Sequence, residues 1–216
     1  MDTPLLKVVT PAASQLLTTL ARVKLELGIT DATHDDLLDI FVRDASARAA
    51  TYCRRVFMSE RVSEQFRAAS FSDASSAIDF PMQLMLSRLP VTNIVSVTVD
   101  GEILVEDTDF ETELDLGYLW RLESDVRTFW QFSKATIVYD GGFTSATLPA
   151  DVEKGVVALA KASWFAKTQD PAIQRESTPG VYDVTYRDGG GDSMNGGLAS
   201  PDARAWLDPF RLIRFY

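Results

Sequence analysis

Apolar residues recur at helical spacing in three stretches of the chain. The clearest stripe lies in residues 148–168 and contains Val152, Val156 and Leu159. Pro149 fits the first turn of this helix, because a proline there loses no backbone hydrogen bond. An apolar stripe of this width must be buried against another element. The rest of the chain therefore has to cover it.

Two further helical stretches lie nearer the N-terminus. We expect the first to begin at a cap at Ser14 and to stop at Gly28, a residue that favours the left-handed conformation of a helix end. The second begins at Asp35 or Asp36 and continues for about five turns, to Val56. Together with the later helix, these stretches predict a helical bundle.

Residues 59–147 follow the pattern of short strands instead. Arg61–Ala68 alternates between apolar and polar residues, and Asp100-Gly101 lies between two β-branched runs, which strongly favours a tight hairpin. A second antiparallel pair is expected around Gly117, and a strand at Ala135–Tyr139 ends in a glycine turn. These signals predict an antiparallel β block inserted between the helices.

The composition changes again after the third helix. Val181–Tyr186 alternates like a strand, and the glycine-rich stretch that follows is typical of a flexible linker. The last sixteen residues combine aromatic side chains with arginines, a composition typical of an interface anchor. The alternative is that this arm folds back on its own domain, and we favour docking to a partner. The candidate contacts are Arg204, Trp206, Leu207, Phe210, Arg211, Arg214, Phe215 and Tyr216.

These patterns divide the chain into five parts. They are N-terminal helices (1–58), a β-rich block (59–147), a closing helix (148–170), a glycine-rich linker (171–200) and a C-terminal docking arm (201–216). The expected fold is α+β: a helical bundle from the N-terminal and closing helices, with an inserted antiparallel β block and an extended C-terminal arm.

Most of the net charge of −10 lies in one segment. Residues 100–125 contain ten acidic residues and one arginine. Such a surface repels phosphate groups, so we expect no specific binding to DNA. It is either a solvated hairpin edge or a functional acidic surface. The candidate surface residues are Glu102, Glu106, Asp107, Asp109, Glu111, Glu113 and Asp115.

Residues that usually perform catalysis or bind metals are scarce. Cys53 is the only cysteine and His34 the only histidine, which excludes an intrachain disulfide and a multi-histidine metal site. Phosphate-binding glycine loops and nucleophilic serine motifs are absent from the sequence. We therefore expect no catalytic residue, metal or cofactor, and no enzymatic activity. Apolar runs are also too short to span a bilayer, and the first residues do not resemble a secretory signal.

The order of these parts resembles that of the head–tail connector (adaptor) proteins of tailed bacteriophages. The resemblance rests on DDLLDIFVRDASARAATYCRRVF, RLPVTNIVSVTVDGEIL, DFETELDLGYLWRL, ATIVYDGGFTSATLPADVEKGVVALA and AWLDPFRLIRFY, in that order. The chain departs from a minimal member by a longer Glu123–Lys134 stretch and by a longer tail from Glu176.

The resemblance implies a structural protein of the virion neck, made in the host cytoplasm. About twelve copies would form a ring that joins the portal protein to a stopper or tail-completion protein and encloses the DNA channel. The C-terminal arm would bind the portal. The acidic segment would either line the channel, where it lets DNA slide, or dock on a basic neighbour. No contact with a membrane is implied.

Two alternatives remain open. One is another neck or tail protein, such as a stopper or a tail terminator. The other is a carbohydrate-binding or hydrolytic module that uses Glu113, Trp120 and Trp130 on the acidic strands.

Overall fold

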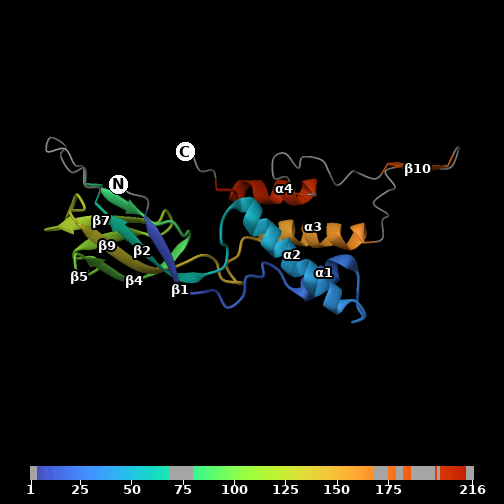
Figure 1. Cartoon of the computed structure of the whole chain (residues 1–216), viewed down its shortest axis with the longest axis horizontal. Coiled ribbons are helices and arrows are strands. Elements are labelled where there is room, and N and C mark those ends of the chain that lie inside the picture. Colours follow the sequence, from blue (N-terminus) through green and yellow to red (C-terminus); the bar gives the residue numbers. More distant parts are fainter. Residues whose placement is uncertain are drawn as a thin grey trace. The chain divides into compact units, whose positions relative to one another are not determined.

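The chain folds into two compact units, which we call the β unit and the helical unit (Figure 1). The β unit comprises Met1–Ala13 and Met58–Ala146, and the helical unit comprises Ser14–Phe57 and Thr147–Tyr216. The expectation of an α+β fold is confirmed. The structure is a computed structural model, and it describes residues 4–68, 80–167, 175–178, 182–185, 198 and 200–212.

The first sheet of the β unit has five antiparallel strands, and it includes a strand from the very start of the chain. The sequence patterns predicted no strand there. The strands, in sheet order, are β1 (Leu5–Thr10), β2 (Glu60–Arg67), β9 (Lys134–Gly141), β4 (Val91–Val99) and β5 (Glu102–Leu104). β1 and β5 therefore form the two edges of this sheet.

The second sheet is antiparallel as well. It consists of β3 (Gln83–Met85), β7 (Tyr118–Glu123), β6 (Phe110–Glu113) and the short strand β8 (Val126–Thr128), which pairs with β7. Both predicted hairpins are confirmed: Asp100-Gly101 joins β4 to β5, and the turn between β6 and β7 contains Gly117. Gly117 has a φ of +69°, a conformation that glycine adopts without strain.

The core of the β unit contains residues from both sheets. Leu119 and Phe110 of the second sheet and Ile137 of the first are almost completely buried in it. The Glu123–Lys134 stretch contributes Trp130, which is fully buried and donates a hydrogen bond of 3.0 Å from its indole nitrogen to the carbonyl of Leu119. The extra length of this stretch thus completes a sheet and its core.

The described residues of the helical unit form four α-helices and a short 3-10 helix. They are α1 (Leu20–Leu27), α2 (Asp35–Cys53), α3 (Ala150–Ala166), α4 (Pro201–Leu207) and the 3-10 helix η2 (Asp208–Phe210). The expected stop at Gly28 is confirmed, because Gly28 ends α1 with a φ of +69°. The expected cap at Ser14 is wrong: the hydroxyl of Thr19 accepts the hydrogen bond from the backbone N–H of Arg22 and begins the helix five residues later.

The apolar stripes of these helices meet as expected. Val152 and Val156 of α3 are fully buried, as are Leu38 and Val42 of α2. A short antiparallel hairpin follows α3, formed by β10 (Arg175–Thr178) and β11 (Tyr182–Thr185), and the second strand lies within the predicted Val181–Tyr186 segment. Within the described part of the chain, no helix is both long and apolar enough to cross a membrane.

Candidate interaction surfaces

The C-terminal segment begins with a well-formed helix cap. The hydroxyl of Ser200 accepts a hydrogen bond of 3.3 Å from the backbone N–H of Ala203, and Pro201 occupies the first turn of α4. A serine followed by a first-turn proline and an acidic residue, here Asp202, is a local sequence that favours such a cap. The cap orients α4 so that Ala203 and Leu207 are both completely buried.

Leu207 fits into a notch on α3. A Cβ atom built on Gly155 would lie only 2.7 Å from Cγ of Leu207, so the missing side chain of Gly155 makes the room that Leu207 occupies. Figure 1 shows α4 lying beside α3 and α2. Leu207 is therefore a core residue of its own unit in this structure.

The chain after α4 is attached to the end of α2. The hydroxyl of Tyr52 donates a hydrogen bond to the carboxylate of Asp208, and the backbone N–H of Leu212 donates one of 2.9 Å to the carbonyl of Cys53. Burial, together with the bond to Asp208, raises the pKa of Tyr52. Burial also raises the pKa of the Cys53 thiol to about 11, so this cysteine is a protonated core residue at neutral pH.

Aromatic contacts add to this attachment. Phe210 packs edge-on against Phe57, with ring centroids 6.5 Å apart, and the guanidinium of Arg211 lies 5.2 Å from the ring centroid of Tyr52. Residues 201–212 thus fold back on their own unit, which is the alternative to partner docking that the sequence left open. Their docking on the portal is not excluded by this arrangement and stays a prediction.

Trp206 is the most accessible aromatic residue of this segment. Its side chain is 41% exposed, and the ammonium of Lys154 lies 4.6 Å from its ring centroid. Arg204 is half-buried and lies 3.8 Å from the carboxylate of Asp208. The remaining candidate contacts, Arg214, Phe215 and Tyr216, lie outside the described residues.

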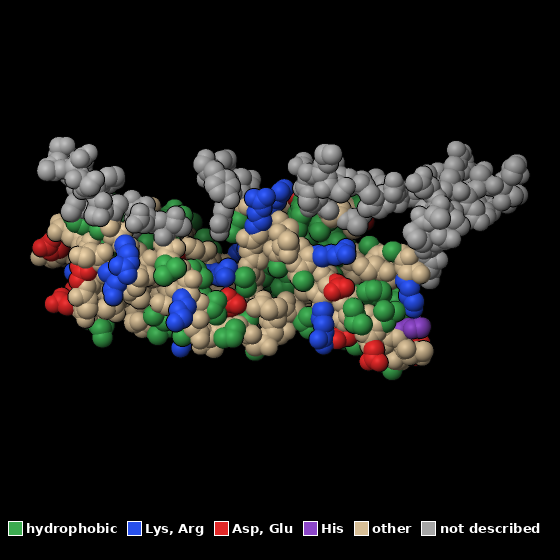
Figure 2. Space-filling model, in the orientation of Figure 1, with side chains coloured by type: hydrophobic (Ala, Val, Ile, Leu, Met, Phe, Trp, Pro, Cys, Tyr) green, Lys and Arg blue, Asp and Glu red, His purple; other side chains and the backbone are tan. Residues whose placement is uncertain are grey.

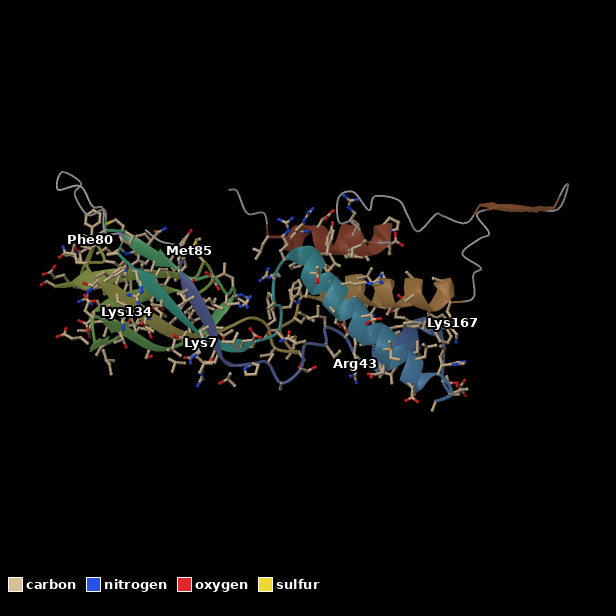
Figure 3. All side chains as sticks on the ribbon, in the orientation of Figure 1. Lys7, Arg43, Phe80, Met85, Lys134 and Lys167 are labelled. Atoms are coloured by element: carbon tan, nitrogen blue, oxygen red, sulfur yellow. The ribbon has the colours of Figure 1, made fainter. Side chains whose placement is uncertain are left out.

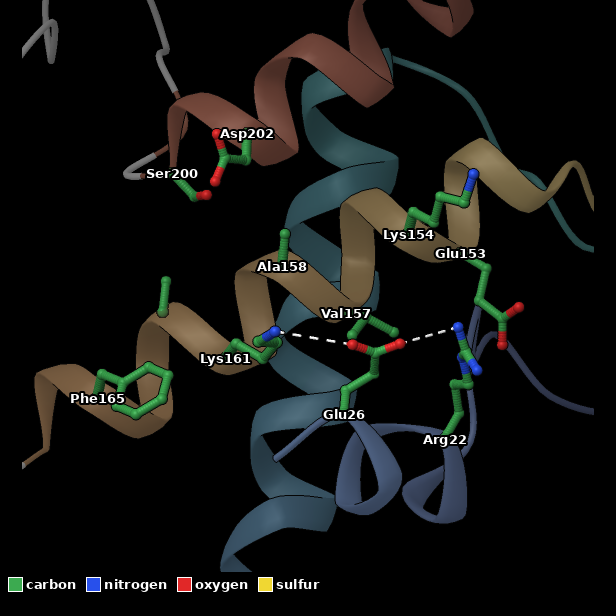
Figure 4. Close-up of a pocket in the computed structure, with 11 residues that line it drawn as sticks. Arg22, Glu26, Glu153, Lys154, Val157, Ala158, Lys161, Phe165, Ser200 and Asp202 are labelled. Atoms are coloured by element: carbon green, nitrogen blue, oxygen red, sulfur yellow. Dashed lines mark ion pairs between the residues drawn. The ribbon is translucent and has the colours of Figure 1, made fainter. Parts of the chain in front are cut away.

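A groove of about 390 Å³ runs along α3 beside the start of α4 (Figure 4). Its apolar part includes Val157, Ala158 and the exposed ring of Phe165. On the opposite wall the carboxylate of Glu26 lies 2.9 Å from Arg22 and 3.7 Å from Lys161. An apolar floor with paired charges at the rim suits a peptide segment better than a small ion. Lys154 belongs both to this groove and to the contact with Trp206, so the two features are continuous.

The acidic candidates gather on the edge strands of the β unit, β5 and β6, and on their connections. Asp109 and Glu111 are half-buried, and the other five side chains are exposed. Two of these carboxylates also make local hydrogen bonds: Asp109 accepts one of 2.9 Å from the backbone N–H of Val105, and Glu106 accepts one of 2.7 Å from the side-chain hydroxyl of Thr112. Figure 2 shows acidic side chains at the end of the unit where Figure 1 labels β5 and β7.

Trp120 and Trp130, the two tryptophans of the β unit, do not form a shared binding surface. Trp130 is in the core, and the ring of Trp120 is covered by Arg127, whose guanidinium lies 4.3 Å from the ring centroid and pairs with Glu111. A sugar ring would need an open aromatic face for stacking. The geometry expected for a carbohydrate-binding module is therefore missing.

The single histidine and the single cysteine that the sequence singled out make packing contacts with described residues. His34 precedes α2 and packs edge-on against Trp164, with ring centroids 5.2 Å apart, and Cys53 is buried under Leu207. Across the described residues, no three His, Cys, Asp or Glu side chains are arranged to hold a metal ion.

One buried carboxylate was missed by the sequence reasoning. Glu64 is completely buried in the β unit, where it accepts hydrogen bonds from the backbone N–H and hydroxyl of Ser87 and from the hydroxyl of Tyr139. Burial and the nearby Glu64 carboxylate raise the pKa of Tyr139. The signal was present: Glu64 lies midway between the apolar residues Val62 and Phe66 on the inward face of β2.

Comparison with known proteins agrees with this architecture. Residues 17–82 match the family of phage gp6-like head–tail connector proteins, which confirms the resemblance noted in the sequence. This is a family of structural proteins and not of enzymes, as expected. No curated protein matches the sequence at a significant level.

Three solved structures share the fold over 98% of this chain and 97% of theirs. One is the neck of an empty GTA particle computed with C6 symmetry, at a TM-score of 0.56 and 14% identity. Another is the neck of a native GTA particle computed with C12 symmetry, at a TM-score of 0.52 and 16% identity. The third is the virion of a native gene transfer agent (GTA) particle, at a TM-score of 0.55 and 16% identity.

Proposed function

We propose, since residues 17–82 are those of a phage gp6-like head–tail connector protein, that this chain is a structural neck protein of a phage-like particle. About twelve copies form a ring that joins the portal to a stopper or tail-completion protein and encloses the channel through which the genome passes. The observation that carries the proposal is the likeness of the fold, over 98% of the chain, to a chain of a neck computed with C12 symmetry. The protein is made in the host cytoplasm and acts in the virion.

In this proposal the portal contact is made by the exposed part of the C-terminal segment. Trp206 is accessible, and Arg204 and Arg211 present guanidinium groups that pair well with carboxylates. Leu207 and Phe210 support this contact indirectly, because they hold the segment on its own helices. Arg214, Phe215 and Tyr216, which lie outside the described residues, are further proposed portal contacts.

The acidic surface faces either the DNA channel or a basic neighbouring protein. Exposed carboxylates repel the phosphate backbone and release no bound counterions, so DNA slides past them without being held. Glu102, Glu113 and Asp115 are exposed, and no described side chain forms an ion pair with them. The same negative charge would attract a basic partner.

A pull-down tests whether the C-terminal arm binds the portal. Tagged protein is incubated with a lysate of cells that produce the particle, and the amount of portal oligomer that it retains is measured. We compare the tagged full-length chain, a chain that ends at Leu212 and the Trp206→Ala variant, with Leu25→Ala as a control for loss of an exposed apolar side chain. Ending the chain at Leu212 spares the core contact of Leu207. We expect the portal to be retained by the full-length chain and the control, and lost or weakened at least about tenfold in the other two.

Two other outcomes have different meanings. If all four proteins retain the portal equally, the arm is not the portal contact, although the neck function stands. If none retains any virion protein, the neck function itself is contradicted.

A further inference from the structure

Among the described residues, the two edges of the five-stranded sheet are both open: β1 pairs only with β2, and β5 pairs only with β4. Over the described residues, the backbone groups on the outer sides of β1 and β5 form no other hydrogen bond. An open edge presents N–H and C=O groups that can pair with a strand of another chain.

The β1 edge is unusually apolar for an exposed strand. Leu5 is 69% exposed, Val8 and Val9 are also exposed, and the only charge on the strand is Lys7 (Figure 3). Proteins usually protect such an edge with several charges, a proline or a bulge. β1 has a bulge-like register shift between Val8 and Thr10, and Pro4 and Pro11 flank it, but Leu5–Val8 keeps a regular ladder with β2 and leaves apolar side chains exposed. Its composition therefore suits a strand that is covered in the assembled state.

The β5 edge combines apolar and acidic side chains. Ile103 is 75% exposed, Val105 is exposed beside it, and Glu102 and Glu106 flank them. This edge lies at the opposite end of the same sheet from β1. A strand that docks here would cover Ile103 and Val105 and would be attracted if it carried a positive charge.

The charges of the two ends are complementary. All exposed charged side chains on β1 and β2 are basic, because the two carboxylates of β2 are buried. All charged residues from Glu102 to Glu113 are acidic. Figure 2 shows Lys and Arg side chains over the β1 and β2 face, and Asp and Glu side chains at the far end of the unit.

We propose that β1 of one copy pairs with β5 of a second copy, so that the sheets of neighbouring copies join edge to edge. This inference rests on the proposed ring and names the contact between its subunits. Pairing two β5 edges would bring acidic residues together, whereas pairing β1 with β5 matches opposite charges and covers apolar side chains on both strands. Because it uses different surfaces on the two copies, this contact is heterologous and closes into a ring when the rotation fits.

Cysteine cross-linking tests the pairing directly. The variants are Lys7→Cys, Ile103→Cys and the two combined, in the full-length chain treated with a short bismaleimide. Lys7 and Ile103 are exposed and lie near the middle of their strands, and the native Cys53 is buried, so the unmodified chain is the background control. We expect a ladder of dimers, trimers and larger species only for the double variant. Dimers from Lys7→Cys alone would indicate symmetric β1–β1 pairing and overturn the proposal.

Charge exchange in the chain without added cysteines provides a second test, in which sedimentation velocity measures the yield of dimers and larger species. Lys7→Glu should lower the yield of larger species about tenfold, and adding Glu102→Lys should restore it. Lys134→Glu is the matched control, because it makes the same change of charge at an exposed residue of the central strand β9. Equal losses from Lys7→Glu and Lys134→Glu would contradict a specific role for the β1 edge.

Electron microscopy of the same samples separates this inference from the proposed function. Rings that form without cross-linking of the double variant overturn the edge pairing and leave the ring intact. A chain that stays monomeric and uncross-linked at the highest soluble concentration also overturns the edge pairing, while portal retention remains the test of the neck function.

Discussion

The hydroxyl of Tyr139 donates a hydrogen bond of 2.7 Å to the fully buried carboxylate of Glu64 on the adjacent strand. The same hydroxyl accepts a hydrogen bond of 3.0 Å from the backbone N–H of Arg88. Ser87 donates to Glu64 as well, so the segment that precedes β4 is held on the sheet through this pair. Buried polar groups of this kind stabilise a fold only while each of them keeps its partners.

Tyr139→Phe should therefore destabilise the β unit. The change removes one donor to the Glu64 carboxylate and the acceptor of the Arg88 N–H, and we expect the free energy of unfolding to fall by about 1–3 kcal/mol. Denaturant unfolding measures this as a lower midpoint at an unchanged slope. Tyr118→Phe is the control, because Tyr118 is half-buried in β7 and its hydroxyl has no partner among the described residues. Tyr118→Phe should change the free energy of unfolding by less than about 0.5 kcal/mol. Equal effects of the two changes would contradict a role for the buried pair.

Alkaline pH should also destabilise the protein. The pKa values of Tyr139 and Tyr52 are raised by burial and by the carboxylates of Glu64 and Asp208, so both phenols stay protonated in the folded chain above their usual pKa of about 10. The unfolded chain releases these protons first. The stability that these two phenols contribute is therefore complete below pH about 10 and is lost as the pH rises above it. Unfolding midpoints between pH 8 and 11 measure the loss, and it should be smaller in Tyr139→Phe. A flat profile in the unchanged protein would refute the prediction.

The effect of Gly155→Ala on the free energy of unfolding should change sign when Leu207 is replaced by alanine, because Leu207 fills the notch at Gly155. Gly155→Ala should gain about 1 kcal/mol of helix propensity but lose about 1–3 kcal/mol by overpacking against Leu207, so the net effect is destabilising. Leu207→Ala alone should lower the stability by about 2–5 kcal/mol. In the Leu207→Ala variant, Gly155→Ala should stabilise the protein. The overpacking against Leu207 is then absent, and only the gain of about 1 kcal/mol in helix propensity remains. Unfolding of the four proteins of this cycle measures the coupling, and additive effects would count against the notch.

Two glycines with the same backbone conformation should differ in their tolerance of alanine. Gly28 and Gly117 both have a φ of +69°, so alanine costs about 1–2 kcal/mol of backbone strain at each. A Cβ at Gly117 would lie 2.4 Å from Cδ2 of Leu89, whereas nothing lies within 4 Å of one at Gly28. Gly117→Ala should therefore destabilise the protein by about 1–3 kcal/mol more than Gly28→Ala. Thermal or denaturant unfolding compares them, and the difference should shrink when Leu89→Ala is added.

Local signals in the sequence predicted the elements that depend on local interactions. The stripe of α3, the stop at Gly28 and the Asp100-Gly101 hairpin all follow from neighbouring residues, and the structure contains them. The start of α1 was predicted wrongly because tertiary contacts compete with the helix there. Leu17 is buried, and its backbone N–H donates to the hydroxyl of Ser46, 29 residues away. β1 was missed for a similar reason, since its partner lies about 55 residues further along the chain.

The candidate surfaces were predicted unevenly. The cap at Ser200 depends on neighbouring residues alone, but the docking of Leu207 depends on the missing side chain of Gly155, on another helix. No pattern within residues 201–216 reveals that notch. The burial of Glu64 follows from strand parity once Val62 and Phe66 are assigned to the core, yet its donors Ser87 and Tyr139 come from other elements.

The acidic residues of the acidic segment fall into two groups that differ in which substitutions their backbone conformation tolerates: those in left-handed turns and those on strands. Asp107 and Asp125 have positive φ angles, a conformation that few residues other than glycine, asparagine and aspartate adopt readily. Replacement by Asn or Gly would remove their negative charge at little strain, whereas a lysine would strain the turn. Glu102 and Glu113 lie on strands and carry no such restriction, so related chains can reverse the charge there at little structural cost. The acidity of this segment is thus partly a by-product of how its turns are built.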